Sequence, residues 1–288
     1  MNDGKEPALP SLREVIARHG LSANKRLGQH FLLDSNITDR VVRAAGSLDG
    51  INVVEIGPGP GGLTRSLLRS GVSHIVAIEQ DRRCIDTLNE LAAVYPGRLD
   101  IIEGDALQLD PVELIAEPRR IVANLPYNIS VPLILRWLHR AECYAGFTVM
   151  VQKEVADRLA AAPGGKTYGR LSVMAQWLCD IHVDFTLSPR AFIPPPKVTS
   201  AVIVMTPLAR PRAEADRRLL ETVTAAAFGQ RRKMLRSSLK GLGLNPSDVD
   251  IDPERRAETL SVEEFCRLAR LLAEQKNDTA GVSTQSVD

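Results

Sequence analysis

Residues 53–62 join a short β-forming run to a loop of glycine and proline. The stretch is Val53-Val54-Glu55-Ile56-Gly57-Pro58-Gly59-Pro60-Gly61-Gly62, and a helical pattern begins near Leu63. Glycine permits tight turns and lets a ligand approach the backbone. In a doubly wound α/β sheet, nucleotide-like ligands bind at the loop that follows the first strand. The loop therefore predicts a nucleotide-type site, although its G-x-G-x-x-G spacing also suits a strand–helix turn that binds nothing.

Strand and helix patterns alternate along most of the chain. Runs typical of strands occur at 51–56, 74–79, 99–103, 120–124, 145–151, 182–187 and 200–206. Helical periodicity appears at 12–19, 36–48, 63–70, 81–94, 130–141, 152–161 and 169–180. Strands that alternate with helices predict βαβ units and a mostly parallel seven-stranded sheet. Since no long helix separates the last two strands, we expect a hairpin and an antiparallel edge strand there.

The strand pattern ends at Pro207, and only helical patterns follow it. These lie at 214–228, 230–240 and 261–274, and Ser261 with Glu264 forms a predicted capping box. The sequence thus predicts an α/β domain at 1–207 and a small all-α domain at 208–274. Residues 275–288 are polar and lack apolar periodicity, which predicts a disordered tail.

The composition limits the classes of protein to consider. The 288 residues are 44% hydrophobic and 25% charged, with a formal net charge of +1, which excludes a wholly disordered or collagen-like chain. Any nucleic-acid site must then be a local concentration of basic residues. The four cysteines are scattered without a C-x-x-C pair, so we expect no zinc or other metal site. Without a long apolar run or a signal-peptide pattern, we expect a cytoplasmic protein with no membrane segment.

Two carboxylates follow the next two predicted strands. Glu79 ends the second strand, about 20 residues beyond the loop, where an acid can accept hydrogen bonds from both ribose hydroxyls. Asp105 follows the third strand and is placed to accept a bond from an adenine amino group. These acids favour an adenosine ligand. Pro58 and Pro60 remove two N–H donors that a pyrophosphate would use, so S-adenosylmethionine is favoured over NAD, which stays open.

The fourth strand ends in Asn124-Leu125-Pro126-Tyr127. Pro126 biases Leu125 away from the helical region, which directs the Leu125 carbonyl toward the cleft beside the side-chain oxygen of Asn124. Two such acceptors can hold both hydrogens of a planar amino group, and the Tyr127 ring can stack on the attached base. Hydrogen bonds of this kind raise the electron density on the nitrogen and favour its attack on a methyl sulfonium. The segment predicts N-methylation of adenine, against the alternative of a purely structural turn.

Four segments together resemble the ribosomal RNA adenine dimethyltransferase family, most closely its small-subunit members. They are Gly28-Gln29-His30-Phe31-Leu32, residues 55–61, residues 124–128 and Phe192-Ile193-Pro194-Pro195-Pro196-Lys197-Val198. The resemblance extends over about residues 22–274. It implies a Rossmann-like methyltransferase domain with a helical C-terminal domain. It also implies S-adenosylmethionine-dependent dimethylation of two adjacent adenosines near the 3′ end of 16S rRNA, on the immature small subunit, by a monomer.

When the motifs are matched one by one, the resemblance implies which residues of this chain bind the donor and which are catalytic. The family's donor contacts fall on His30, Leu32, Gly57, Gly59, Glu79, Asp105 and Asn124, and its catalytic segment on Asn124, Leu125, Pro126 and Tyr127. The aromatic residue that helps to sandwich the target adenine falls on Phe192, for which core packing is the alternative. The family usually has asparagine at the position of His30, so its contact with the donor is the least secure.

A basic run in the predicted helical domain supplies a candidate RNA-binding surface. Between residues 231 and 240 it contains Arg231, Arg232, Lys233, Arg236 and Lys240 and no acid. Lys25, Arg26, Lys153, Lys166 and Arg170 are expected to extend the positive surface. The alternative for the run is an ordinary solvated helix face. Two other functions stay open: a large-subunit rRNA adenine dimethyltransferase, and an RNA-binding assembly factor with secondary catalysis.

Overall fold

The structure, a computed structural model, describes residues 9–24 and 27–283. Lys25, Arg26 and the last five residues of the predicted tail lie outside the described residues. The chain divides into two compact units. The first contains the residues up to Ala156 together with His182–Pro207, and the second contains Asp157–Ile181 together with the residues from Leu208 onward.

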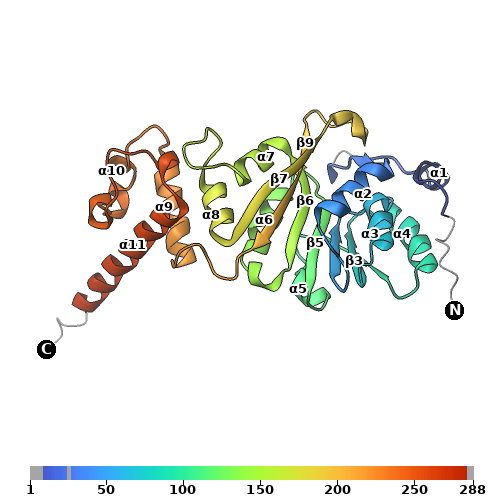
Figure 1. Cartoon of the computed structure of the whole chain (residues 1–288), viewed down its shortest axis with the longest axis horizontal. Coiled ribbons are helices and arrows are strands. Elements are labelled where there is room, and N and C mark those ends of the chain that lie inside the picture. The colour runs from blue at the N-terminus through green and yellow to red at the C-terminus, as the bar shows by residue number, and fades with distance from the viewer. Residues whose placement is uncertain (1–8, 25–26, 284–288) are drawn as a thin grey trace. The chain divides into compact units, whose positions relative to one another are not determined.

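A seven-stranded sheet forms the centre of the first unit (Figure 1). Its strands are β2 (Asn52–Ile56), β3 (His74–Glu79), β4 (Leu99–Glu103), β5 (Arg119–Asn124), β6 (Gly146–Gln152), β7 (Cys179–Leu187) and β9 (Ser200–Pro207). They are ordered β4-β3-β2-β5-β6-β9-β7, and the pairs from β4 to β6 are parallel. The seven predicted strands and the mostly parallel, Rossmann-like sheet are therefore confirmed.

An antiparallel pair lies near the end of the sheet, as expected, but it joins β9 to β6; the two strands of the expected hairpin, β7 and β9, are neighbours in the sheet. Strand β9 pairs antiparallel with β6, and Gln152 lies opposite Ser200 in this register. β9 lies between β6 and β7, so the edge position itself belongs to β7. A separate two-stranded sheet pairs β1 (Phe31–Leu32) with β8 (Phe192–Ile193), and in it Leu32 lies opposite Phe192.

Helices follow most strands of the first unit. They are α1 (Leu12–Arg18), α2 (Ser35–Ala44), α3 (Gly62–Arg69), α4 (Arg82–Val94), α5 (Pro111–Leu114), α6 (Ser130–Leu138) and α7 (Lys153–Leu159), with 3-10 turns at Ala141–Cys143 and Pro189–Ala191. Aspartates 34, 81 and 110 cap the N-termini of α2, α4 and α5 by accepting a backbone N–H of the first turn. The strand interiors supply the core, as Val53, Ile75 and Val122 show, which are fully buried.

Glycine lets α3 approach strand β1 very closely. A Cβ atom built on Gly62 would lie 2.6 Å from the backbone oxygen of Leu32, which is inside any real contact distance. The first residue of α3 must therefore lack a side chain if β1 is to lie where it does. This contact fixes the start of the helix that follows the glycine-rich loop.

The second unit is helical and has its own core. It contains α8 (Arg170–Leu178), α9 (Arg217–Gly229), α10 (Leu235–Ser238) and α11 (Val262–Ser283), with 3-10 turns at Lys240–Leu242, Pro246–Val249 and Ala257–Thr259. Tyr168, Val173 and Trp177 of the α8 segment pack in one cluster with Leu220 and Phe265. This packing explains why residues 157–181 group with the second unit, although the sequence predicted a boundary at 207.

Two predicted features of the second unit are wrong. The continuous helix expected at 230–240 is replaced by a turn after Gly229 and by the short α10, because Met234 adopts an extended backbone and bridges to Arg256. The tail expected to be disordered from 275 is helical as far as Ser283. Gln275 and Lys276 favour helix, so α11 continues beyond its packed face. The predicted capping box is confirmed, because Ser261 N donates to Glu264 (2.7 Å) and Glu264 N donates to Ser261 (3.2 Å).

No helix within residues 9–24 and 27–283 has both the length and the apolar character that a membrane crossing requires.

The close approach at Gly62 yields a test of stability. We expect Gly62→Ala to lower the free energy of unfolding by about 1–3 kcal/mol, since the new methyl group meets a backbone oxygen that cannot rotate away. Urea unfolding followed by circular dichroism measures this change. The matched control is Gly229→Ala, where an added Cβ meets nothing within 4 Å. Equal stabilities of the two variants would contradict this account.

Candidate active site

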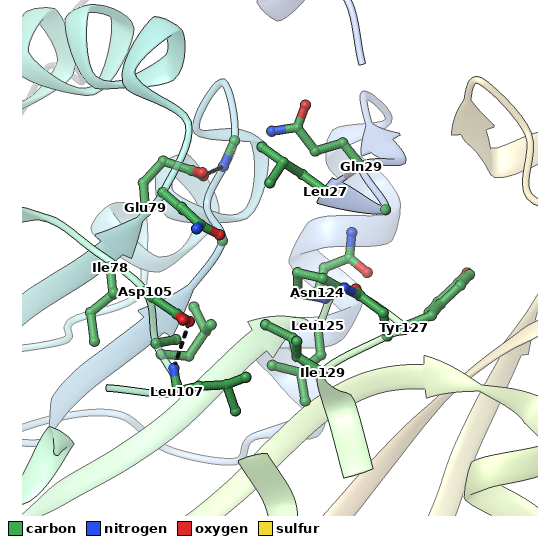
Figure 2. A pocket seen from close by; sticks show the side chains of 18 of the residues that line it. Leu27, Gln29, Ile78, Glu79, Asp105, Leu107, Asn124, Leu125, Tyr127 and Ile129 are labelled. Atoms are coloured by element: carbon green, nitrogen blue, oxygen red, sulfur yellow. Dashed lines mark hydrogen bonds between the residues drawn. The ribbon is translucent and has the colours of Figure 1, made fainter. Parts of the chain in front are cut away.

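A cleft of about 350 Å³ opens at the carboxyl ends of strands β2 to β5. Its lining comes from the segment before β1, the glycine-rich loop, the ends of β3 and β4, and the turn after β5. Figure 2 shows Glu79 and Asp105 on one side of this cleft and Asn124, Leu125 and Tyr127 on the other. Of the predicted site residues, it is lined by His30, Gly57, Gly59, Glu79, Asp105, Asn124, Leu125, Pro126 and Tyr127.

The glycine-rich loop forms one wall through backbone conformations that other residues avoid. Gly57 and Gly59 have φ values of 64° and 56°. A Cβ atom on Gly59 would lie 3.3 Å from the Phe31 ring, and one on Gly57 would lie 3.6 Å from the Pro126 ring. The loop is therefore packed between the segment before α2 and the turn after β5, with its bare backbone facing the cleft.

Glu79 ties this loop to the end of β3. Its two carboxylate oxygens accept the N–H groups of Gly59 and Asp81, each at 2.8 Å. The side chain is only 4% exposed, and burial raises the pKa of Glu79 in spite of these two bonds. The carboxylate lies at the cleft wall, where it could accept bonds from a ligand's hydroxyl groups as well.

Asp105 and three apolar residues form the part of the cleft that suits a flat ring. Asp105 Oδ1 accepts the N–H of Leu107 at 2.9 Å, which fixes the carboxylate and leaves its second oxygen for another donor. Ile78, Leu107 and Ile129 line the cleft nearby (Figure 2). Apolar walls with a few placed polar groups are typical of small-molecule sites. The glycine-rich loop, the two carboxylates and the apolar side chains together fit an adenosine moiety.

Asn124 lies at the end of β5 with its amide held in one orientation. Its Nδ2 group donates to the main-chain oxygen of His30 at 3.3 Å. Since the nitrogen is directed at that oxygen, the side-chain oxygen Oδ1 faces away from it and is left as an acceptor. Leu125 follows with its N–H donated to Met150 at 3.1 Å, which anchors the turn to strand β6.

Tyr127 is held at both ends of its side chain. Its hydroxyl group lies 2.6 Å from Ser200 Oγ, and its ring stacks on that of His30 with a centroid separation of 5.6 Å and an interplanar angle of 30°. His30 in turn lies with Nδ1 2.7 Å from the carbonyl oxygen of Pro194. These contacts set the orientation of the Tyr127 ring.

Leu32 and Phe192 are not part of the cleft lining. They lie opposite each other in the β1–β8 pair, and their side chains are 7% and 2% exposed within the hydrophobic core. The expectation that Phe192 presents its ring to the cleft is therefore wrong, because its side chain packs inward from β8. Leu32 contributes instead through its backbone oxygen at Gly62.

Sequence reasoning missed three residues at or beside the cleft. Phe31 packs against Gly59, and Gln29 donates through Nε2 to Asp81 at 2.9 Å. Both belong to a quoted motif, but their role depends on contacts that are distant in sequence. Glu55, the third, is 1% exposed, and its Oε2 has no hydrogen-bond partner in the described part of the chain. A glutamate inside an apolar β-forming run was the available signal.

The basic residues of the second unit do not share one environment. Arg231 donates through Nη2 to the carbonyl oxygens of Lys166 (2.5 Å) and Tyr168 (3.1 Å), so it holds the 166–168 loop. Arg236 lies 3.4 Å from Glu254. Arg232, Lys233 and Lys240 are exposed. Within the described ranges, no group of three or more His, Cys, Asp or Glu side chains is placed to hold a metal ion.

Comparisons with known proteins identify relatives along almost the whole chain. The profile of the family described as ribosomal RNA adenine dimethylase matches residues 20–274. The ribosomal RNA small subunit methyltransferase A of Rhodospirillum rubrum is 57% identical over 265 residues, which is 91% of this chain and 92% of the relative. The enzyme of the same name from Paramagnetospirillum magneticum is 58% identical over 267 residues, which is 92% of this chain and 95% of the relative.

Two crystal structures share the architecture. A dimethyladenosine transferase from Plasmodium falciparum is 24% identical with a TM-score of 0.73, covering 86% of this chain and 98% of that one. The 23S rRNA methyltransferase ErmE is 25% identical with a TM-score of 0.66, and the match covers 84% of this chain and 99% of ErmE.

Glu55 makes the stability of the protein depend on pH. Burial raises the pKa of Glu55 from its ordinary 4.5 to about 8, and the nearby Glu79 adds to the increase. Between these values the folded protein keeps a proton that the unfolded chain releases, so the free energy of unfolding falls as the pH rises. The slope from this group is up to about 1.4 kcal/mol per pH unit.

Glu55→Gln removes this titration, so we expect the variant to gain stability relative to the parent protein from pH 5 to pH 8. Urea unfolding at several pH values in that range measures the difference. Glu103→Gln, which removes a carboxyl group at an exposed position at the end of β4, is the control and is measured over the same pH range. If the Glu55→Gln difference does not change with pH more than that of the control, the buried carboxyl group does not titrate as described.

Proposed function

The chain belongs to the ribosomal RNA adenine dimethylase family, and from this premise we propose that its cleft methylates the N6 amines of two adjacent adenosines near the 3′ end of 16S rRNA. As a member of that family it is an rRNA methyltransferase. The proposed donor is S-adenosylmethionine, and the proposed substrate is the immature small subunit, on which the protein acts as a monomer. The observation that carries the proposal is the Asn124–Tyr127 turn beside a cleft that fits adenosine.

The donor would be held by the side of the cleft that carries the two carboxylates. Glu79 is proposed to accept the ribose hydroxyls, and Asp105 is proposed to accept an adenine amino group with its second oxygen. The hydrogen bonds that orient the two carboxylates support these roles. Ile78, Leu107 and Ile129 would contact the adenine ring. Bound there, S-adenosylmethionine supplies a methyl group on a positively charged sulfur. The glycine backbone can approach such a ligand closely because it has no side chains.

The target adenine would be held by the other side. Asn124 Oδ1 and the Leu125 carbonyl are proposed to accept the two hydrogens of the amino group, while the Tyr127 ring stacks on the base. Both acceptors lie in a segment anchored to β6 and to the main chain of His30. Acceptors fixed in advance stabilise developing positive charge on the nitrogen without reorganising, which is a main source of catalytic acceleration.

The proton balance needs no dedicated base. Attack of the N6 lone pair forms a carbon–nitrogen bond as the sulfur–carbon bond breaks, and the nitrogen becomes a strongly acidic ammonium. Asn124 Oδ1 and the Leu125 carbonyl accept hydrogen bonds from this nitrogen but do not take its proton, which is transferred to water. The residues therefore act through positioning and electrostatics.

RNA binding would rest on exposed basic residues of the second unit. Arg232, Lys233 and Lys240 are proposed to contact phosphates, while Arg231 shapes the neighbouring 166–168 loop. The target base must leave its stack, which costs a few kcal/mol, and stacking on Tyr127 can offset about 1–3 kcal/mol of this.

The small-subunit substrate is favoured over the large-subunit one by sequence identity. Relatives named as small-subunit enzymes are above 50% identical, whereas the 23S enzyme ErmE is 25% identical. An assembly factor with secondary catalysis is the second candidate, and the exposed basic residues Arg232, Lys233 and Lys240 of the helical unit support it.

Labelled methyl transfer to immature small subunits, with 23S rRNA offered in a parallel reaction, tests the proposal. We expect two dimethylated adenines near the 3′ end of 16S rRNA, mapped by mass spectrometry. Asn124→Ala should lower the rate by about 100-fold or more, as loss of a preorganised electrostatic contact does elsewhere. Asn36→Ala, on the surface of α2, is the control and should be fully active. Methylation of 23S rRNA alone would identify the large-subunit alternative, and an active Asn124→Ala would contradict the mechanism.

The exposed basic residues of the second unit predict RNA binding that depends on salt. Arg232→Ala and Lys233→Ala should each weaken rRNA binding and lower the slope of log affinity against log salt by about 1. Filter binding over a range of salt concentrations measures both. Arg255→Ala removes a charge that is already paired with Glu264 and should leave the slope unchanged. Slopes equal to that of the parent protein in all three variants would place the RNA elsewhere.

A further inference from the structure

His30 connects three segments that lie far apart in the sequence. Its Nδ1 atom is 2.7 Å from the carbonyl oxygen of Pro194, in the proline-rich turn. Its ring stacks on Tyr127, in the turn after β5. Its main-chain oxygen accepts the amide of Asn124. Two of these three contacts are made by the side chain, and both lie on the Tyr127 side of the cleft.

The contact with Pro194 fixes the orientation of the imidazole. A carbonyl oxygen only accepts hydrogen bonds, so Nδ1 of His30 must carry a hydrogen and donate it. Proline has no N–H, and its rigid ring holds the backbone of the turn in place. The imidazole is thus clamped at one nitrogen, and its plane is set against the ring of Tyr127.

The stacking distance decides how a purine can use Tyr127. The two ring centroids are 5.6 Å apart. A base inserted between them would need two stacked contacts of about 3.5 Å each, or roughly 7 Å in all. In this arrangement a base that stacks on Tyr127 must use the opposite face of the ring, with the imidazole behind it. With the hydroxyl group fixed on Ser200 at 2.6 Å, the phenol ring cannot tilt away.

We propose that His30 is a positioning residue for the target adenine: its side chain holds the plane of Tyr127 through the stack and the hydrogen bond to Pro194. The inference rests on the proposed function, and it assigns the His30 side chain to the acceptor side of the reaction instead of the donor side. This support from behind Tyr127 differs from the sandwiching of the base that was expected of Phe192, whose side chain is buried in the core.

Two substitutions separate the two side-chain contacts. His30→Asn keeps a donor nitrogen at the position of Nδ1 and removes the ring. His30→Phe keeps a ring and removes the donor. We expect each to lower kcat/KM for the RNA by about 3- to 10-fold, which is the weight of one stacking or hydrogen-bond contact. The KM for S-adenosylmethionine and the affinity for S-adenosylhomocysteine, measured by calorimetry, should stay within about twofold of the parent protein.

The controls use the same exchanges at His19, which lies at the end of α1 next to Glu90 and away from the cleft lining. His19→Asn and His19→Phe should leave both RNA and donor parameters unchanged, and thermal unfolding shows that each variant is folded. Weaker donor binding with unaltered RNA parameters in His30→Asn would overturn the inference and return His30 to the donor side. Unchanged kinetics in both His30 variants would also overturn it. An inactive parent protein would instead contradict the proposed function.

Discussion

The hydrogen bonds from Gly59 and Asp81 to the buried carboxylate of Glu79 hold the cleft together. They join the loop after β2 to the end of β3, so the relative position of two neighbouring strand ends is set by one side chain. Gly59 can take part only because it adopts a positive φ and leaves room for the Phe31 ring. The burial that raises the pKa of Glu79 also strengthens each bond it makes, since little water competes for it. The other residues that line the cleft lie around these two strand ends.

The regular part of the fold could be predicted because its rules are local. Alternating β-forming and helical runs gave all seven strands, and Ser261 with Glu264 located the start of α11. Each residue that ends a parallel strand lies at the same edge of the sheet, so Glu79 and Asn124 were predictable members of one site. The spacing of apolar residues is enough to predict a strand or a helix where the sequence keeps a single periodicity.

The predictions that were wrong concern residues whose environment is set by contacts between segments that lie far apart in the sequence. The side chain of Phe192 is buried because β8 pairs with β1, a partner some 160 residues earlier, and no local pattern reveals that pairing. The α8 segment belongs with the helical unit because Trp177 and Val173 find their apolar partners on α9 and α11. The basic run is interrupted by the bridge between Met234 and Arg256, which overrides the helical spacing of Leu235 and Leu239.

The amide of Asn124 is oriented by a backbone atom of residue 30, not by its side chain. Any amino acid at that position offers the same carbonyl oxygen, so the polarity of the catalytic amide is insulated from substitution there. A substitution at position 30 therefore changes the ring that supports Tyr127 and leaves in place the main-chain oxygen that orients the Asn124 amide. The support of the substrate and the orientation of the reacting amide thus depend on different atoms of one residue.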